Sequence, residues 1–514
     1  MHLRIVKLVT LAGLVLAACR GAPQATGPGR PASDVGRRAW AAWAQGDVEG
    51  ALRIAAGADA GDPSADRLMA FGLSVKGDYQ GALAHYAQVP AATRDKDLDR
   101  VAIEAYRHLG RYEDAAKLGR DRQVDPFLVA ELEDQAAHPP RVELAGPAVV
   151  PFVDDSLGPF MPGVAAEVNG QAVTARFDSG GTFLVMSPAV ARGLGIALSC
   201  GGKGSHAFVE TDVCFGRAEL RLGAATLHDA PVTTVASLEA ANFTQVIFGT
   251  SVAEQFFTTL DYPGQRLLLS PRGDAALAER QLAGLAGARV TVPFYLWADH
   301  FLFARGAVDA HHDADLFIDS GLVAVTAGSD GKPRQAALHA PTAVLAAWGL
   351  LAAAPTAPGY LPGDVTLALG PLTQTGHLAY YTPALDHLDF GGLPIAGILS
   401  HAFLSRYAWT LDFDRRVFIF TVPAGARDMG TWDCSGAAAQ EVTVPPGQQV
   451  YVWHGRCGGE EGVAIEVKPK LEGGDMSALD VRQDAGLDGT LTLRLDNRGS
   501  APMVVLVSVF VGFA

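Results

Sequence analysis

Charged residues are scarce in this chain. Only 18% of its 514 residues are Asp, Glu, Lys or Arg, and cysteine occurs only 5 times. The net charge is −15 and Lys and Arg form no cluster, which weighs against a nucleic-acid partner because phosphate binding requires a basic face. After the N-terminal segment, no uninterrupted apolar run reaches the ~18 residues that would span a bilayer.

Glycine, proline and apolar residues are plentiful instead. Glycine occurs 58 times, proline 30 times, and 49% of the residues are hydrophobic. This composition favours a β-rich, turn-rich globular protein over a disordered or coiled-coil chain. A chain of this length can form several domains, each with a core of its own.

Motifs of several common enzyme classes are missing. The chain has no Gly-x-Ser-x-Gly elbow and no glycine fingerprint that opens a helix after a strand. His311 and His312, with two nearby aspartates, have the composition of a metal site, but they lie where a hairpin tip is expected. Asp299 and His300 have no partner at motif spacing. We therefore predict neither a metal nor a cofactor.

The N-terminus has the layout of an export signal. A basic lead with Arg4 and Lys7 precedes an apolar run over 8–18, which is too short to span a bilayer as a finished helix. With Cys19 directly after it, segment 1–18 resembles a bacterial lipoprotein signal peptide. The resemblance implies cleavage before Cys19, lipid on its thiol and a membrane tether through the acyl chains. The alternative is an ordinary secretory signal with a chance cysteine.

Residues 19–32 are small and rich in Pro and Gly, which predicts a flexible tether. A lipid anchor at Cys19 would place the protein in the cell envelope, on the extracytoplasmic side. Arg20 does not resemble the aspartate that retains some lipoproteins in the inner membrane, so the outer membrane is favoured.

Residues 33–135 have apolar residues at helical spacing and a recurring glycine. Gly46, Gly77 and Gly110 follow one another at a nearly constant spacing, and each precedes a similar short pattern. A turn glycine between two helices, repeated at this period, resembles the tetratricopeptide repeat. Such repeats often bind peptide segments, so a protein partner is one prediction; a spacer packed on the next domain is the other.

Residues 145–422 alternate apolar and polar residues, as strands do, and contain an internal duplication. The only two Asp-Ser-Gly tripeptides of the chain begin at Asp178 and Asp319. A Val-Pro-Phe tripeptide precedes each of them, and Pro151 stands almost as far ahead of the first aspartate as Pro293 stands ahead of the second. We interpret this as two copies of one β-lobe.

Downstream landmarks repeat as well. Gly249 ends an apolar segment ahead of Asp261, and Ser400 ends a similar segment at the same spacing ahead of Asp412. The hairpin that follows matches in kind, with Arg266 and Arg416 at its start. Four landmarks in register make coincidence improbable.

The two Asp-Ser-Gly segments suggest a specific chemistry. A single such aspartate is most often a turn residue that accepts backbone hydrogen bonds. Two carboxyls about 3 Å apart cannot both ionise, so they share one proton and act together as acid and base. Such a pair can activate water for peptide hydrolysis without a metal or covalent intermediate.

On these motifs, residues 145–422 resemble the pepsin/retropepsin aspartic proteases in a bacterial two-lobed form. The resemblance implies an all-β bilobal fold, with lobe 1 at 145–270, an interlobe linker at 271–288 and lobe 2 at 289–422. It also implies a catalytic dyad of Asp178 and Asp319. The residues implied to support the two loops are Ser179, Gly180, Ser320, Gly321, Gly249 and Ser400, where Ser400 stands in place of the glycine that the family pattern has.

The family also has a flap hairpin over its substrate. A glycine-dense segment after Cys200 resembles the tip of this flap, and a disordered surface loop is the alternative. With Cys214 on the following strand, the two cysteines are well placed to brace the hairpin as a disulfide. The implied flap and substrate-binding residues are Gly201, Gly202, Lys203, Gly204 and Ser205.

Residues 427–514 contain short strand patterns separated by Gly, Asn and Asp turns, which predicts a small β-sandwich. We expect Cys434 and Cys457 to form a disulfide there, so the cysteines divide into one lipidated residue and two pairs.

The sequence thus predicts a multidomain protein: N-terminal α-helical hairpin repeats, a central all-β bilobal protease fold and a C-terminal β-sandwich. Its predicted function is an extracytoplasmic, lipid-anchored aspartic endopeptidase that acts on a peptide or protein substrate. One alternative is a catalytically inactive pepsin-fold binding or scaffold lipoprotein, which the serine at position 400 favours. In another, the repeats and the sandwich organise envelope components and proteolysis is incidental.

Overall fold

The computed structural model describes residues 33–155, 157–158, 160–206, 209–241, 243–327, 333–388 and 390–422, and the segments 431–432, 440–444, 449–457, 462–469, 476–485 and 490–512. Cys19 and Cys434 lie outside the described residues, so the predicted lipidation site and the second predicted disulfide do too. Among the described helices, none combines the length and the apolar character needed to cross a membrane.

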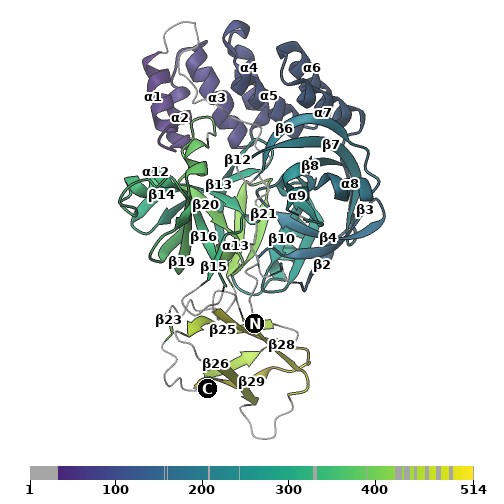
Figure 1. Ribbon diagram of the computed structural model, residues 1–514, viewed down its shortest axis with the longest axis vertical. Coiled ribbons are helices and arrows are strands. Elements are labelled where there is room, and N and C mark those ends of the chain that lie inside the picture. Colours follow the sequence, from purple (N-terminus) through teal and green to yellow (C-terminus); the bar gives the residue numbers. More distant parts are fainter. Residues whose placement is uncertain are drawn as a thin grey trace.

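The N-terminal helices form a layer at one end of the molecule (Figure 1). Gly46, Gly77 and Gly110 each lie in the turn between the two helices of one pair, with φ of 76°, 84° and 67°, a left-handed conformation that glycine adopts without strain. The predicted helix–glycine–helix hairpins are therefore confirmed, whereas their membership of the tetratricopeptide family stays a prediction. The helices are α1 (Asp34–Trp43), α2 (Val48–Ala55), α3 (Pro63–Val75), α4 (Tyr79–Gln88), α5 (Lys96–His108), α6 (Tyr112–Arg122) and α7 (Pro126–Ala137), with a short 3-10 turn η1 (Ala91–Thr93).

The first lobe follows as a β-rich unit with a few short helices. Its elements are β1 (Arg141–Glu143), β2 (Ala148–Val153), β3 (Gly163–Val168), β4 (Gln171–Asp178), β5 (Leu184–Met186), α8 (Pro188–Gly193), β6 (Ser199–His206), β7 (Val209–Leu222), β8 (Ala225–Val235), α9 (Ala236–Ala240), β9 (Val246–Gly249), α10 (Thr250–Ala253), β10 (Phe256–Asp261) and β11 (Arg266–Pro271).

The second lobe repeats this plan after α11 (Ala275–Ala283), a helix within the segment predicted as the linker. Its elements are β12 (Ala288–Trp297), β13 (Phe301–Val308), β14 (His311–Asp319), β15 (Val325–Ala327), β16 (Pro333–Pro341), α12 (Thr342–Ala347), β17 (Gly359–Tyr360), β18 (Val365–Leu369), β19 (Leu372–Thr382), η2 (Pro383–His387), β20 (Gly397–Ser400), α13 (His401–Leu404), β21 (Ala408–Asp412) and β22 (Val417–Val422).

One sheet joins the two lobes and displays the duplication. Its strands run β2–β11–β10–β21–β22–β12, so each strand of the first lobe has a counterpart in the second. The counterparts β10 and β21 pair at the centre, where the hydroxyls of Thr259 and Thr410 lie 2.6 Å apart. Because both threonines stand two residues before the matched aspartates of the repeat, this contact marks an approximate twofold relation between the lobes.

The sequence alignment of the closing hairpins is wrong by one residue. The amide of Phe152 donates to the carbonyl of Gln265, and the equivalent amide of Phe294 donates to the carbonyl of Arg416. Gln265 and Arg416 are therefore the equivalent residues, not Arg266 and Arg416. Both have positive φ, at 53° and 55°, because the chain makes the same tight turn there.

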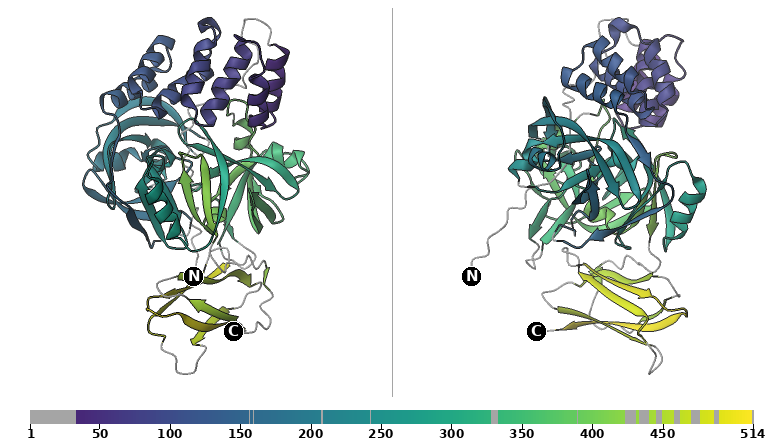
Figure 2. Two further views of the ribbon diagram at one scale, coloured as in Figure 1. Left: turned by 180° about the vertical axis from the view of Figure 1, so that it is seen from behind. Right: turned by 90° about the vertical axis from the view of Figure 1, so that its right-hand side faces the viewer.

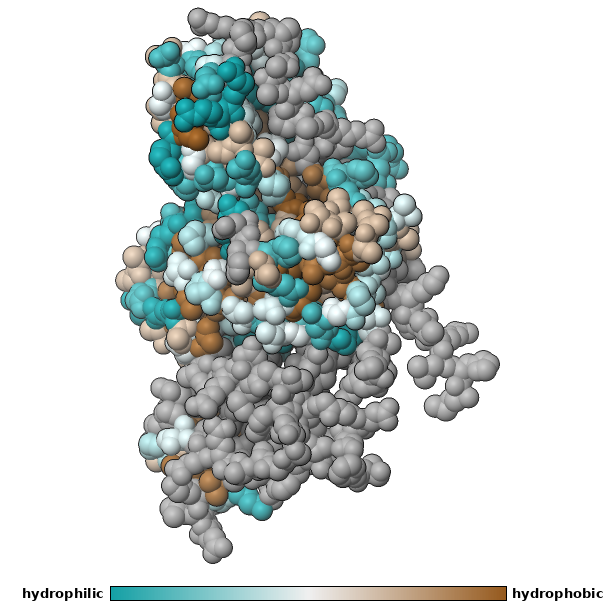
Figure 3. All heavy atoms as spheres, turned by 90° about the vertical axis from the view of Figure 1, so that its left-hand side faces the viewer, coloured by the Kyte–Doolittle hydropathy of each residue, from teal (hydrophilic) through white to brown (hydrophobic). Residues whose placement is uncertain are grey.

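The helical layer shares a core with the second lobe rather than standing apart from it. Trp43 and Phe71 belong to one buried cluster with Phe301 and Phe317, and the rings of Phe71 and Trp297 lie 5.7 Å apart. In the face shown in Figure 3, apolar surface gathers below the helical layer, over the β-rich part. This shared core fixes the helices against the lobes.

The C-terminal strands lie at the end opposite the helical layer (Figure 2). They form a sheet of β23, β25, β28 and β27 and a second sheet of β24, β29 and β26. Their packing as a β-sandwich stays a prediction. The strands are β23 (Thr431–Trp432), β24 (Gln440–Val444), β25 (Gln449–Cys457), β26 (Gly462–Pro469), β27 (Leu479–Ala485), β28 (Thr490–Asn497) and β29 (Met503–Gly512).

Candidate active site

The first Asp-Ser-Gly loop begins where strand β4 ends. The last residues of β4 are buried, and Asp178 itself is 0% exposed. One carboxylate oxygen, Oδ1, accepts a hydrogen bond from the amide of Gly180 at 2.8 Å, and the amide of Gly181 donates to the carbonyl of Asp178 at 3.0 Å. The turn therefore fixes the carboxyl at the strand end, as the sequence predicts.

The second loop repeats this geometry at the end of β14. Asp319 is also 0% exposed, and its Oδ1 accepts from the amide of Gly321 at 3.0 Å. The same short sequence thus gives the same local structure twice.

The two loops meet through their serines. The amide of Ser179 donates to Oγ of Ser320 at 3.0 Å, and the amide of Ser320 donates to Oγ of Ser179 at 2.9 Å. The Ser179 hydroxyl also donates to the carbonyl of Ile318 at 2.9 Å. These reciprocal bonds hold the loops of the two lobes together.

The two carboxyls lie side by side as a result. A Cβ placed on Gly180 would be 2.5 Å from the carboxyl carbon of Asp319, and one placed on Gly321 would be 2.2 Å from that of Asp178. Each glycine thus leaves room for the carboxyl of the opposite loop. Burial, the charge of Asp178 and a hydrogen bond between the two carboxyls raise the pKa of Asp319 well above its usual value.

Each loop has a strand behind it in the same register. Asp178 pairs with Gly249 in the parallel pair β4–β9, and Asp319 pairs with Ser400 in β14–β20. A Cβ on Gly249 would come within 2.1 Å of the carbonyl oxygen of Gly181, so the position requires glycine. Ser400 fits at its own position because its hydroxyl donates to the carbonyl of Ala336 at 2.6 Å.

Residues 164–252 match the family model described as aspartyl protease. The matched segment runs from β3 to α10 and contains both the Asp178 loop and Gly249. Among curated proteins, none matches this chain. Among solved structures, the chain is similar to the crystal structure of aspartic proteinase from Irpex lacteus, with 10% identity, a TM-score of 0.33 and coverage of 54% of this chain and 97% of that one.

An additional residue, Asp299, joins the matched segment to the rest of the protein. This aspartate lies in the turn between β12 and β13, and it accepts a hydrogen bond from Thr182, four residues after Asp178, at 2.6 Å. Its backbone carbonyl accepts from Ser251 at 3.1 Å. No sequence pattern indicates this role, because Thr182 is 117 residues away.

Asp299 also connects the loop to the helical layer. Its carboxylate lies 2.6 Å from His300 and 4.0 Å from Arg107 of α5. Burial acts to raise the pKa of Asp299, but His300, Arg107 and the Thr182 hydrogen bond lower it well below its usual value. Asp299 is therefore ionised in the folded protein and holds three parts of the chain together.

A second ion pair also links the helical layer to the β-rich lobes. His108 of α5 lies 3.2 Å from Glu254, which follows α10 of the first lobe. Burial opposes ionisation of Glu254, yet His108, Arg416 and Arg272 lower its pKa to about 2, and the pKa of His108 is raised against its own burial. The end of α5 therefore contacts both lobes.

The predicted flap segment forms a hairpin, but its glycines are not the tip. Gly202, Lys203 and Gly204 belong to strand β6 and pair with β7, which corrects the prediction of a glycine-dense tip over 200–205. At position 202 the strand requires glycine, because a Cβ there would come within 2.5 Å of the ring of Phe127. The Phe127 ring of α7 also packs against Phe215 of β7 at 5.2 Å.

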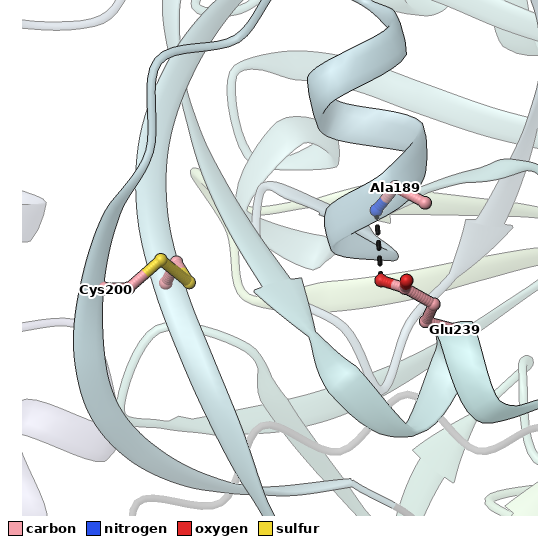
Figure 4. The surroundings of a disulfide bond; sticks show 4 residues. Ala189, Cys200 and Glu239 are labelled. Carbon is pink, nitrogen blue, oxygen red and sulfur yellow. Dashed lines mark hydrogen bonds between the residues drawn. A yellow bond between two sulfur atoms is a disulfide. The ribbon is translucent and has the colours of Figure 1, made fainter.

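Cys200 and Cys214 form the predicted disulfide at the base of this hairpin (Figure 4). The two residues are directly paired across β6 and β7. Farther along, Lys203 pairs with Asp212 on the exposed side of the hairpin. The side chain of Ser205 lies outside the described ones.

Within the described part of the chain, no group of three potential metal-ligating side chains is present. His311 begins β14 directly after the turn that follows β13, and its ring stacks on Trp348 at 4.7 Å. Nearby, Asp315 pairs with Arg305 at 3.2 Å. The side chain of His312 lies outside the described ones.

Proposed function

We propose that this protein is an aspartic endopeptidase in which Asp178 and Asp319 act as a dyad. The proposal rests on one observation above all: two loops that share an Asp-Ser-Gly tripeptide, from two halves of the chain, bring two buried carboxyls together. The match of residues 164–252 to the aspartyl protease family supports the same type of function.

In the proposed mechanism, the two carboxyls share one proton. The ionised carboxyl takes a proton from a water molecule, whose oxygen attacks the carbonyl carbon of the scissile peptide bond. The protonated carboxyl gives its proton to the carbonyl oxygen, which forms a neutral gem-diol. When the carbon–nitrogen bond breaks, the departing nitrogen receives the proton of one carboxyl, and the other carboxyl takes a proton from a gem-diol hydroxyl, whose oxygen becomes the carbonyl oxygen of the new carboxylic acid. The dyad returns to its starting state, with one proton on the pair.

The raised pKa of Asp319 affects the pH range over which this mechanism can cleave a substrate. Activity requires that one carboxyl be protonated and the other ionised. Because burial and the charge of Asp178 keep Asp319 protonated above its usual pKa, we expect activity to extend to a higher pH than an isolated carboxylic acid would allow.

A cleavage assay tests the proposal. Protein that begins near Ser33 is incubated with mixed peptides from acid to neutral pH, with and without a statine inhibitor. We expect Asp178→Asn and Asp319→Asn to abolish cleavage, whereas Asp364→Asn, a matched change at an exposed pair with Arg334, should leave it intact. Cleavage that survives either dyad substitution would refute the dyad. A folded wild-type protein that cleaves nothing at any pH would favour the scaffold alternative.

We also propose that the protein is anchored in the cell envelope by lipid on Cys19. The proposal rests on the order of basic lead, apolar run and cysteine at the N-terminus. Incorporation of a labelled fatty acid into the full chain, and its loss in Cys19→Ser, is the expected result. Equal labelling of both proteins would exclude this site. A protein partner on the helical layer stays a prediction.

A further inference from the structure

The loop that carries Asp178 contacts the second lobe at its far end as well as through its serine. Thr182, which ends the loop, donates a hydrogen bond to the carboxylate of Asp299. In the second loop, Val323 stands at the matching position, and its side chain has no hydrogen-bonding group. The internal duplication therefore does not account for this contact, and the first loop has a support that its copy lacks.

The contact at Thr182 is part of a small buried hydrogen-bond network. The Thr182 hydroxyl lies 2.6 Å from Oδ2 of Asp299 and 3.2 Å from the hydroxyl of Ser251. The Ser251 hydroxyl donates to the backbone carbonyl of Asp299 at 3.1 Å. Thr182 and Ser251 are both buried, so water does not compete for these bonds.

The turn that carries Asp299 is itself held in place. The backbone carbonyl of Ala298 accepts a hydrogen bond from Nε2 of His108, the last residue of α5, at 2.9 Å. The Asp299 carboxylate lies 2.6 Å from Nδ1 of His300 and 4.0 Å from Arg107. Because the Asp299 side chain is only 17% exposed, salt screens these charges weakly. A side chain fixed in this way can hold another one in place.

A shift of Thr182 would be transmitted to the Asp178 carboxyl, because the turn between them is short and hydrogen-bonded. The amide of Gly181 donates to the carbonyl of Asp178 at 3.0 Å, and the amide of Thr250 donates to the carbonyl of Gly181 at 2.9 Å. A dyad requires its carboxyls to lie about 3 Å apart. A misplacement of about 1 Å can lower a reaction rate by about 100-fold.

We infer that Asp299 is a positioning residue of the proposed active site: its carboxylate fixes Thr182 and thereby the loop that carries Asp178. The inference rests on the proposed function and deepens it, because it adds a carboxylate from outside the two Asp-Ser-Gly loops. Asp299 takes no part in the proton transfers of the proposed mechanism. Its effect is on the geometry of the dyad, and therefore on kcat more than on substrate binding.

The experiment breaks the contact from both sides and includes two matched controls. Thr182→Val is nearly isosteric and removes only the hydroxyl, whereas Asp299→Ala removes the acceptor. Thr182→Ser keeps the hydroxyl. Thr258→Val is the same isosteric change at a buried threonine of β10, whose hydroxyl donates to the carbonyl of Ala253 at 2.9 Å, outside the two loops.

We expect Thr182→Val and Asp299→Ala each to lower kcat by about tenfold and to change KM by less than about twofold. The double variant should be no slower than the slower single variant, because both changes break one contact. Thr182→Ser and Thr258→Val should keep kcat within about twofold of wild type. If Asp299→Ala does not fold, the comparison of Thr182→Val with Thr182→Ser decides alone. Equal kcat in wild type and Thr182→Val, or effects of the two substitutions that multiply, would overturn the inference.

Hydrogen–deuterium exchange of backbone amides separates this inference from the proposed function. The amides of residues 179–182 should exchange about tenfold faster in Thr182→Val than in wild type, and at the wild-type rate in Thr258→Val. If wild type cleaves nothing but this difference is present, Asp299 positions the loop and the protease proposal fails. If wild type cleaves peptides and neither kcat nor exchange differs in Thr182→Val, the inference fails and the protease proposal stands. If there is neither cleavage nor a difference in exchange, both fail.

Discussion

The reciprocal serine contact between the two loops gives the sharpest prediction. In Ser179→Ala, the buried hydroxyl is lost while the backbone is unchanged. The amide of Ser320 then has no acceptor from Ser179, and the carbonyl of Ile318 loses its donor. Both loops should lose part of the support that holds the carboxyls together.

The magnitude follows from these two bonds. A buried donor or acceptor left without a partner costs about 1–3 kcal/mol, and a carbonyl tolerates the loss better than an amide does. We therefore expect Ser179→Ala to lower the free energy of unfolding by about 2–4 kcal/mol. A matched control is Ser187→Ala, which is 2% exposed and loses only the bond from the amide of Val190 at the start of α8, at a cost of about 1 kcal/mol.

The assay combines urea unfolding, followed by tryptophan fluorescence, with peptide cleavage. Ser179→Ala should lower both the unfolding midpoint and kcat, because the dyad geometry changes. Ser187→Ala should lower the midpoint slightly and leave kcat unchanged. If the two variants have the same stability and the same kcat, the serine contact does not hold the dyad, and the reasoning is refuted.

Three further predictions concern the surroundings of the dyad. The folded state raises the pKa of Asp319, so the contribution of this residue to the free energy of unfolding is fully present below the unfolded-state pKa and is lost as the pH rises through the raised value. Asp319→Asn should therefore be more resistant to urea than wild type at neutral pH. A difference that persists unchanged at acid pH would contradict this. Gly249→Ala should prevent stable folding or abolish cleavage, since its Cβ would meet the backbone of Gly181. Ser400→Gly should lower the free energy of unfolding by only about 1 kcal/mol, because it loses one hydrogen bond to Ala336. Equal effects of the two substitutions in thermal unfolding would contradict the assigned geometry. Glu254, with its pKa lowered to about 2, contributes about 3 kcal/mol to the free energy of unfolding above its usual pKa of 4.5, and this contribution is lost as the pH falls through about 2. Glu254→Gln should thus destabilise the protein at neutral pH but not at pH 2. An effect that does not depend on pH would argue against the ion pair with His108.

Much of the geometry of the proposed dyad could be predicted from the sequence because its determinants are local and repeated. Each aspartate is held by its own Ser-Gly turn, within the next few residues. The spacing to Gly249 and Ser400 is matched in the two lobes because the strand behind each loop must return in the same register. The exact equivalence of Gln265 with Arg416 was not predictable, because it depends on a turn conformation rather than on residue type.

The contacts that surround the two aspartates could not be predicted from the sequence in this way. The glycines of β6 resemble a loop in the sequence, and only the ring of Phe127, from another region, shows why the strand has a glycine at position 202. Asp299 has no partner near it in the chain apart from His300; Thr182 and Arg107 reach it only after the lobes and the helices have packed together.

By itself, the sequence determined two half-copies of a β-lobe, the helical hairpins in front of them and the aspartates at two strand ends, because hydrophobic periodicity and turn chemistry act over a few residues. Only the tertiary structure decided that the helical layer shares its core with the second lobe and that α5 contacts both lobes. These features depend on contacts between residues that are far apart in the sequence, and no local pattern specifies such contacts.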